Sequence, residues 1–182
     1  MRRIEGYVIV SADGMIADAN GVVPDAIRND ADQKFFQGAL DRAAAVVHGR
    51  HSYEGGPRAT RRKRLVLTRQ VAKTAPDPDH PNSLLWNPTG ISLDAAIEQL
   101  GAADGPVAII GGTEVFSVFL PYYDAFFLSH APNARIPGGR PVFNEVGPNA
   151  TPEDVLRRHG LHPGARRDLD AAAGVSVTTW ER

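Results

Sequence analysis

Short apolar segments rich in β-branched residues alternate along this chain with segments of helical periodicity, and this alternation constrains the fold more than any other feature. The strand-like segments lie at residues 4–12, 45–49, 64–68, 84–86, 107–110, 125–131 and 175–180. The helical segments lie at about 29–43, 92–100, 113–120 and 151–160. Segments 13–28 and 69–83 hold glycines or prolines and are expected to be irregular. This order of elements indicates an α/β fold around a largely parallel sheet, with room for an antiparallel C-terminal strand.

Several of the expected helices begin at residues whose side chains can cap them. Asn29 or Asp30 starts the first helix, Ser92 the second and Thr151 the last. A side-chain oxygen at such a position accepts hydrogen bonds from N–H groups that the first helical turn leaves free. These caps indicate where the helices start. We expect one more short helix to begin at Arg50, directly after the second strand.

The composition excludes several classes of protein. With 182 residues, the chain is long enough for one domain that spans residues 1–182 and needs no cross-link or metal to hold its core. It has 20 basic and 21 acidic residues, which argues against a general nucleic-acid binder. The absence of cysteine excludes disulfides, thiolate zinc sites, iron–sulfur clusters and cysteine nucleophiles. No segment approaches the ~18 apolar residues of a membrane span, so we expect a soluble, cytoplasmic protein without a signal peptide.

The strongest functional motif is the segment 109–116, in which an apolar strand enters a double glycine that opens a helix. Glycine lets the backbone turn tightly and lets a ligand approach it closely. The helix start at Thr113 then offers free N–H groups and a partial positive charge, which favour a phosphate. A plain strand–helix turn is the alternative, and the motif alone leaves both interpretations open.

A second strand end, in the segment 47–54, carries similar chemistry. Arg50, His51 and Ser52 can all donate hydrogen bonds to a phosphate. Because ligands of open α/β sheets bind at the carboxyl ends of strands, two such ends predict one extended dinucleotide. Metal binding by His48 and His51 is not expected. One lies within the strand and the other beyond its end, and no nearby carboxylate completes a site.

Two further segments allow both a structural and a functional interpretation. The run 58–64 holds five basic residues, which form either a solvated loop or a site for a phosphate or carboxylate. Asp30 and Asp32 either cap the helix that follows or provide an acid at the mouth of a nucleotide cleft. Asp32 and Phe36 are four residues apart and share a helix face, so they can present an acid and an aromatic wall to a flat ring.

Taken together, these segments resemble the dihydrofolate reductase superfamily, which includes the reductase domain of riboflavin biosynthesis. The resemblance extends over nearly the whole chain and rests on segments 10–17, 49–54, 65–68 and 110–130, which follow the family's order and spacing. It implies a three-layer α/β fold with a mostly parallel central sheet, an antiparallel C-terminal strand and flanking helices. It also implies NADPH as the hydride donor and, in the family, an unusual cis peptide at the double glycine.

The resemblance assigns cofactor contacts by position. The residues implied are Ile16, Ala17, Gly49, Arg50, His51, Ser52, Thr68, Arg69, Gly111, Gly112, Thr113 and Val115. The first two would flank the nicotinamide, those from 49 to 69 would hold the adenosine and phosphate end, and the others would cradle the diphosphate.

The substrate side is assigned in the same way. Ser129 matches a threonine that orients the family's acid, and Arg62 falls near the arginine that binds a substrate carboxylate. Phe36 would be the aromatic wall. The acid is Asp30 when counted from the loop proline and Asp32 when counted to Phe36, and we prefer Asp32.

Two segments favour the riboflavin-type branch over true dihydrofolate reductases. Segment 138–143 resembles the G-x-P-[LV]-F motif of that branch, and the opening of segment 11–17 leans the same way, although no deaminase zinc motif precedes them. We therefore expect an NADPH-dependent reductase of a pyrimidine or pterin-type heterocycle, as in riboflavin biosynthesis. Dihydrofolate reductase is the first alternative, and a catalytically silent nucleotide-binding protein is the second. We expect a small heterocyclic substrate and no nucleic-acid or membrane partner, and we leave a homodimer open.

Overall fold

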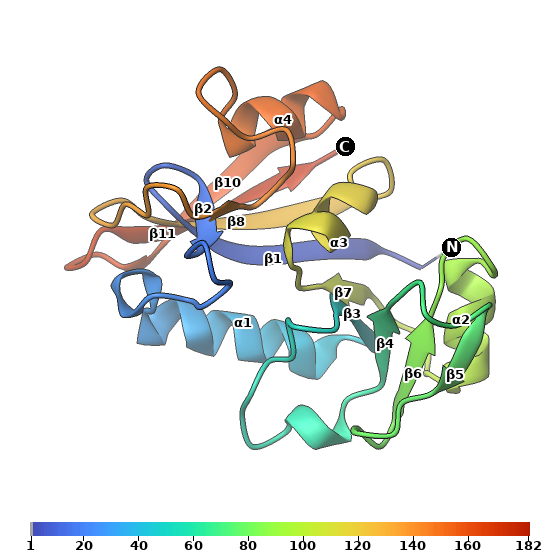
Figure 1. Cartoon of the computed structure of the whole chain (residues 1–182). Helices are drawn as coiled ribbons and strands as arrows, with labels where there is room; N and C mark the ends of the chain where they lie inside the picture. Colours follow the sequence, from blue (N-terminus) through green and yellow to red (C-terminus); the bar gives the residue numbers. More distant parts are fainter. Residues whose placement is uncertain (1) are drawn as a thin grey trace.

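The computed structural model describes residues 2–182, which form a nine-stranded sheet with helices on both faces (Figure 1). The sheet strands are β1 Ile4–Ser11, β3 Ala45–Gly49, β4 Arg64–Leu67, β5 Thr74–Pro76, β6 Ser83–Trp86, β7 Val107–Ile109, β8 Ala125–Ala131, β10 His162–Asp170 and β11 Val175–Glu181. A separate ribbon pairs β2 Met15–Ala17 with β9 Arg140–Pro141. The helices are α1 Asp30–Arg42, α2 Leu93–Leu100, α3 Thr113–Val118 and α4 Pro152–Arg158, with single-turn 3₁₀ helices η1 Asp25–Ile27 and η2 Ala59–Arg61.

The centre of the sheet is parallel. Its strand order is β10-β11-β8-β1-β7-β3-β4-β6-β5. Strand β1 runs parallel to both β7 and β8, and β3 runs parallel to β7 and β4. At the edges, β11 runs antiparallel to β8, and β5 runs antiparallel to β6. The expected α/β fold with an antiparallel C-terminal strand is confirmed.

The helices divide between the two faces of the sheet because successive strand residues point to opposite sides. Tyr7 of β1 packs with Leu40 and Phe36 of α1 on one face. Val10 of the same strand joins a larger core on the other face, to which α2, α3 and α4 all contribute. In Figure 1, α1 accordingly lies below β1 while α3 and α4 lie above it. No helix among residues 2–182 is long and apolar enough to cross a membrane.

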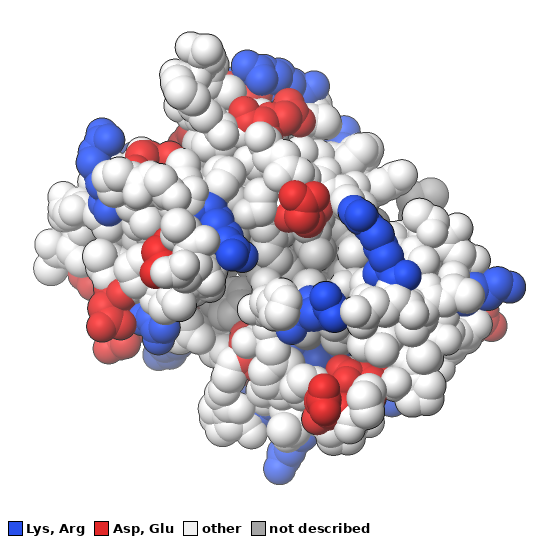
Figure 2. Space-filling model, in the orientation of Figure 1, with Lys and Arg blue, Asp and Glu red and all other residues white. Residues whose placement is uncertain are grey.

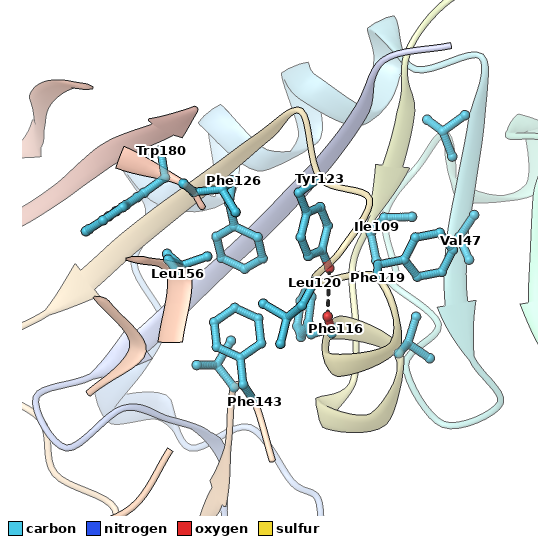
Figure 3. Packing of buried hydrophobic residues seen from close by; sticks show 14 of the residues in the cluster. Val47, Ile109, Phe116, Phe119, Leu120, Tyr123, Phe126, Phe143, Leu156 and Trp180 are labelled. Atoms are coloured by element: carbon cyan, nitrogen blue, oxygen red, sulfur yellow. Dashed lines mark hydrogen bonds between the residues drawn. The ribbon is translucent and has the colours of Figure 1, made fainter. Parts of the chain in front are cut away.

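Aromatic rings fill the larger core (Figure 3). Phe126 meets Phe116, Tyr123 and Phe143 with ring centroids 5.0 to 5.7 Å apart. The buried hydroxyl of Tyr123 donates to the carbonyl of Phe116 at 3.2 Å. Glycine at position 6 makes room for this packing, because a Cβ there would lie 2.3 Å from the Phe126 ring. The core therefore fixes β1 against β8 and the loop that follows α3.

The caps expected from the sequence are present. The Asn29 side chain accepts from the N–H groups of Ala31 and Asp32, and Ser92 accepts from the N–H of Ala95. Thr151 and Asp154 form a reciprocal capping box at the start of α4.

Four expectations about local structure were wrong or incomplete. No helix begins at Arg50. Residues 50–58 form turns and irregular backbone that includes Gly55, Gly56 and Pro57, and only η2 follows. The segments expected to be irregular contain β2, η1 and β5, and α3 ends at Val118 rather than near residue 120. Strand β10 was missed because most of it is exposed, so it carries no alternating apolar pattern.

Candidate active site

A cleft of about 960 Å³ lies between α1 and α3, where several parallel strands end. Its floor comes from β1 and from Ser129 of β8, and its roof comes from the β2–β9 ribbon and the loop 20–27. Segments 49–54 and 112–116 form the remaining wall. Figure 2 shows the hollow on this face of the molecule, with basic side chains along its rim. The two strand ends that the sequence singled out therefore do meet at one cleft.

Asp32 is the buried acid of this cleft. Its exposed fraction is 8%, and it lines the cleft from the first turn of α1. Burial raises the pKa of the Asp32 carboxyl above its ordinary value, and the nearby Ser129 hydroxyl opposes that rise. Asp30 is exposed and is not among the residues that line the cleft. Of the two candidate acids, the structure brings only Asp32 to the site.

The cap of α1 explains why Asp32 is available. The Asn29 side chain already accepts from the N–H groups of Ala31 and Asp32, at 3.0 Å each. The Asp32 carboxyl is thus not needed as a cap and turns toward β8. The strand register sets Ser129 opposite Ile9, so both lie below this carboxyl on the α1 side of the sheet.

Apolar and aromatic side chains surround the acid. Phe36 lies one helical turn after Asp32 and lines the cleft, as the spacing predicted. Ile16 and Ala17 of β2 close the cleft from the roof. Tyr7 lies deeper, stacked on Phe127 with a centroid distance of 4.6 Å. The inner cleft is therefore a narrow, mostly apolar slot with one carboxyl group, which suits a flat ring.

Glycines open a backbone cradle beside this slot. The N–H of Gly49 donates to the carbonyl of Gly111 at 2.8 Å, which joins the two strand ends. The peptide between Gly111 and Gly112 is cis, as it is in the family that the sequence resembles. A Cβ at Gly112 would lie 3.3 Å from the Ser52 hydroxyl, and a Cβ at Gly49 would lie 3.5 Å from Val115. A side chain at Gly112 would crowd the Ser52 hydroxyl and one at Gly49 would contact Val115, so glycine at both positions leaves the backbone of the cradle uncovered.

The remaining cofactor candidates surround this cradle. Arg50, His51, Ser52 and Thr113 line the cleft. Thr68 and Arg69 do not line it, although they follow β4, which is the neighbour of β3. Thr68 is buried, and its hydroxyl accepts from the N–H of Gln70.

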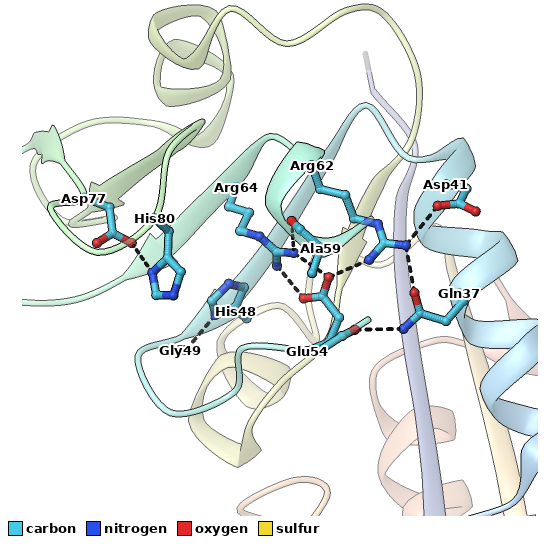
Figure 4. Close-up of polar contacts among 11 residues, drawn as sticks. Gln37, Asp41, His48, Gly49, Glu54, Ala59, Arg62, Arg64, Asp77 and His80 are labelled. Atoms are coloured by element: carbon cyan, nitrogen blue, oxygen red, sulfur yellow. Dashed lines mark hydrogen bonds and ion pairs between the residues drawn. The ribbon is translucent and has the colours of Figure 1, made fainter. Parts of the chain in front are cut away.

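Two arginines of the basic run 58–64, Arg62 and Arg64, turn inward and join an ion-pair network (Figure 4). Arg62 donates to Glu54 at 2.7 Å, to Gln37 at 2.8 Å and to Asp41 at 2.9 Å. Arg64 is fully buried and pairs with the same carboxylate of Glu54. Burial opposes ionisation of Glu54, but both guanidinium groups hold its pKa below the ordinary value.

This network occupies the guanidinium groups of Arg62 and Arg64 with carboxylates of the same chain. Arg62 is buried and is not among the cleft-lining residues, so the geometry does not support a contact between Arg62 and the substrate. Arg58 also pairs with Asp41. Sequence reasoning missed this outcome because Asp41 lies 17 or more residues before its partners, and only the packing of α1 against η2 brings them together.

Several cleft-lining residues were not assigned a role from the sequence, and three of them are polar or aromatic side chains on different sides of the cleft. Arg140 of β9 lines the roof, Tyr7 lines the floor, and Glu54 lines the wall while holding the buried arginines. The glycines before Arg140 marked a turn, but nothing in the local pattern connected that turn with the loop 20–27.

A family model described as dihydrofolate reductase matches residues 6–150 of this chain. None of the curated protein sequences matches it. Among solved structures, a deaminase/5-amino-6-(5-phosphoribosylamino)uracil reductase from Thermotoga maritima is similar, with a TM-score of 0.67 and 17% identity. The match covers 99% of this chain and 56% of the other, so this chain spans little more than half of that protein.

Two further structures match along nearly their whole length. A riboflavin biosynthesis protein from Shewanella sp. PV-4 has a TM-score of 0.65 and 21% identity, with 100% of this chain and 99% of the other covered. A dihydrofolate reductase from Enterococcus faecalis, complexed with NADP(H) and RAB-propyl, has a TM-score of 0.61 and 18% identity. Here the match covers 99% of this chain and 96% of the other. At these identities the comparisons establish the fold.

Proposed function

Because this chain belongs to the dihydrofolate reductase family, we propose that it is an NADPH-dependent reductase of a flat nitrogen heterocycle. The observation that carries this proposal is Asp32, a buried carboxyl beside a glycine cradle in one cleft. A buried acid with a raised pKa, next to a hydroxyl and an aromatic wall, suits proton transfer to a bound heterocycle.

The cradle fits the phosphate end of a dinucleotide. Side chains at positions 49 and 112 would fill the space next to Val115 and Ser52, so their absence leaves backbone accessible to a ligand. Gly112, Thr113 and Ser52 would hold the diphosphate. Arg50, His51, Thr68 and Arg69 would hold the adenosine end.

At the other end of the cleft, Ile16 and Ala17 would flank the nicotinamide and exclude water from it. The bound NADPH supplies a hydride to the substrate. The protein then has to orient the nicotinamide against the substrate ring and to transfer one proton. Residues of the inner cleft perform both functions.

The finer proposal is a riboflavin-type substrate, and the state of Arg62 supports it. The position resembles the arginine that binds a substrate carboxylate in dihydrofolate reductases. Here its guanidinium is 7% exposed and holds Glu54, Asp41 and Gln37. Arg62 would therefore add little to the binding of a folate tail. A pyrimidine without such a tail, such as the phosphoribosylaminouracil for which the Thermotoga protein is named, needs no contact with Arg62.

The riboflavin-type reaction needs one hydride and one proton. In that reaction a hydride would add to C1′ of the ribosylamino group as the bond from C1′ to the ring oxygen breaks, and the ring oxygen would take a proton to give the ribitylamino product. Asp32 holds or relays this proton. Because its pKa is raised by burial, it keeps a proton at higher pH than an exposed aspartate does.

A titration with cofactor followed by substrate tests the proposal. The purified protein is titrated with NADPH and with NADH under nicotinamide fluorescence, and then mixed with 5-amino-6-(5-phosphoribosylamino)uracil or with dihydrofolate. We expect preference for NADPH and its oxidation by the pyrimidine. Rapid oxidation by dihydrofolate instead would establish the dihydrofolate reductase alternative. Binding without oxidation by either would establish a silent nucleotide-binding protein, and failure to bind NADPH would end the reductase proposal.

A further inference from the structure

Arg140 is a cationic side chain of the cleft that the proposed function does not use. It lies on β9, lines the roof of the cleft and is exposed. Among residues 2–182 its side chain makes no ion pair and one long hydrogen bond, from Nη2 to the carbonyl of Ala19 at 3.4 Å. A guanidinium in a ligand cleft without a carboxylate partner is available to an anion on the ligand.

The surrounding backbone makes room for this guanidinium. A Cβ at Gly21 would lie 2.8 Å from Nη1 of Arg140, and the φ of Gly21 is +82°, a conformation that glycine adopts readily. The next residue, Pro141, accepts a hydrogen bond from the hydroxyl of Thr113 on α3. The backbone beside Arg140 is thus held to α3 through Pro141, and its guanidinium lies over Gly21 of the roof loop.

Arg140 and Arg50 stand at different places on the cleft. The strand register pairs Arg140 with Ala17 of β2, which is the expected nicotinamide side. Arg50 follows the end of β3 beside the glycine cradle. Figure 2 shows basic side chains on both sides of the hollow. Arg62 and Arg64, by contrast, are held by Glu54. Two separate uncompensated cations indicate two separate anionic groups, and the dinucleotide phosphates account for the one near Arg50.

We propose that Arg140 binds a phosphate group of the substrate, so that the second ligand of the cleft is a phosphorylated heterocycle. This inference rests on the proposed function, because it assigns the phosphate to the molecule that meets the nicotinamide. A planar guanidinium recognises phosphate through two parallel N–H donors, which a roof position above the ring slot can direct onto a sugar phosphate. Recognition of the substrate anion thus lies at Arg140 and not at Arg62.

Calorimetric titration with ribose 5-phosphate tests the site directly. The purified full chain is titrated once in saturating NADP⁺ and once without cofactor. Arg140→Gln should weaken ribose 5-phosphate binding at least about tenfold, because a charged hydrogen-bonded pair is lost. Its affinity for NADPH should stay within about twofold of the unmodified protein. Arg50→Gln should show the reverse pattern. Arg140→Lys, which keeps the charge but loses the two parallel donors, should bind ribose 5-phosphate more weakly than the unmodified protein and more tightly than Arg140→Gln.

Arg135→Gln is the matched control. Arg135 is an exposed arginine five residues earlier that does not line the cleft, so its loss should change neither affinity. Ribose 5-phosphate affinity that is equal in Arg140→Gln and the unmodified protein, or that is absent in the unmodified protein, overturns the proposal. So does an effect of Arg140→Gln on NADPH as large as that of Arg50→Gln. NADPH binding and oxidation by the unmodified protein are measured separately, so loss of the Arg140 assignment with both of these retained leaves the proposed function standing.

Discussion

Asp32 lies in the first turn of α1, where Asn29 already caps the helix. Aspartates in the first turn of a helix commonly serve as caps or complement the helix dipole. Here the Asn29 side chain takes the free N–H groups of α1. The neighbouring exposed acid, Asp30, remains at the helix start, whereas Asp32 is directed into the cleft. An offset of two residues along α1 therefore separates a solvated carboxylate from a buried one.

Replacing the acid should abolish turnover without removing the cofactor. Asp32→Asn keeps the shape of the side chain but cannot exchange a proton, so kcat should fall by about 10²- to 10⁴-fold. The Kd for NADPH, read by nicotinamide fluorescence, should not change. Asp30→Asn, two residues away and outside the cleft lining, should leave kcat unchanged. Full turnover in Asp32→Asn would remove the catalytic role from this residue.

The same substitution should increase stability at neutral pH. Because burial raises the folded-state pKa of Asp32, ionising this carboxyl opposes folding at pH values above its unfolded pKa. Asp32→Asn should therefore have a higher free energy of unfolding in urea at pH 7. The gain should shrink as the pH falls toward about 4, where the unmodified side chain also becomes neutral. A gain that does not depend on pH would point to a packing effect instead.

At the scale of elements, the register between β1 and β8 depends on a residue without a side chain. Gly6 faces the aromatic core, where Phe126 occupies the space that its Cβ would need. Because β1 also carries Ile9 opposite Ser129, this packing helps to set the floor of the cleft. Core packing and site geometry are thus coupled through one strand.

Gly6→Ala should destabilise the protein. A Cβ 2.3 Å from the Phe126 ring forces either the ring or the strand to move, which should lower the free energy of unfolding by about 1–3 kcal/mol. Urea denaturation measures the change. Gly55→Ala is the control, since nothing lies within 4 Å of a Cβ at Gly55. Equal midpoints for the two variants would mean that the core relaxes around the added methyl group.

For the whole molecule, Glu54 connects parts of the chain that are remote in sequence. Its carboxylate holds Arg62 and Arg64, and Arg62 reaches Asp41 of α1 (Figure 4). The network thereby fixes the segment 50–62, which carries part of the cleft wall, against both α1 and the sheet.

Glu54→Gln should be strongly destabilising, because it leaves two buried guanidinium groups without their shared counter-charge. We expect a loss of about 3 kcal/mol at pH 7, measured by urea denaturation. Asp104→Asn breaks the exposed pair with Arg2 and should cost less than about 0.5 kcal/mol. The lowered pKa of Glu54 adds a pH signature. Its contribution is present above the ordinary value of 4.5 and should be lost as the pH falls through the folded-state pKa. A loss no larger than that of Asp104→Asn would contradict this role.

Local patterns in the sequence were enough to predict most elements and the two glycine-rich strand ends. Apolar periodicity, helix caps and double glycines act over a few neighbouring residues, so they can be identified without the fold. The caps of α1, α2 and α4 and the exact extent of β8 illustrate this. The exposed strand β10 carries no such pattern and had to be found in the structure.

Only the tertiary structure decided which polar groups line the cleft. The spacing to Phe36 favoured Asp32 over Asp30, but the burial of Asp32 in the cleft and the exposure of Asp30 follow from how α1 packs on the sheet. The withdrawal of Arg62 into an ion-pair network, and the exposure of Arg140 in the cleft, depend on partners that are distant in sequence. The charge of a side chain is set by its residue type, but its availability to a ligand is set by what packs against it.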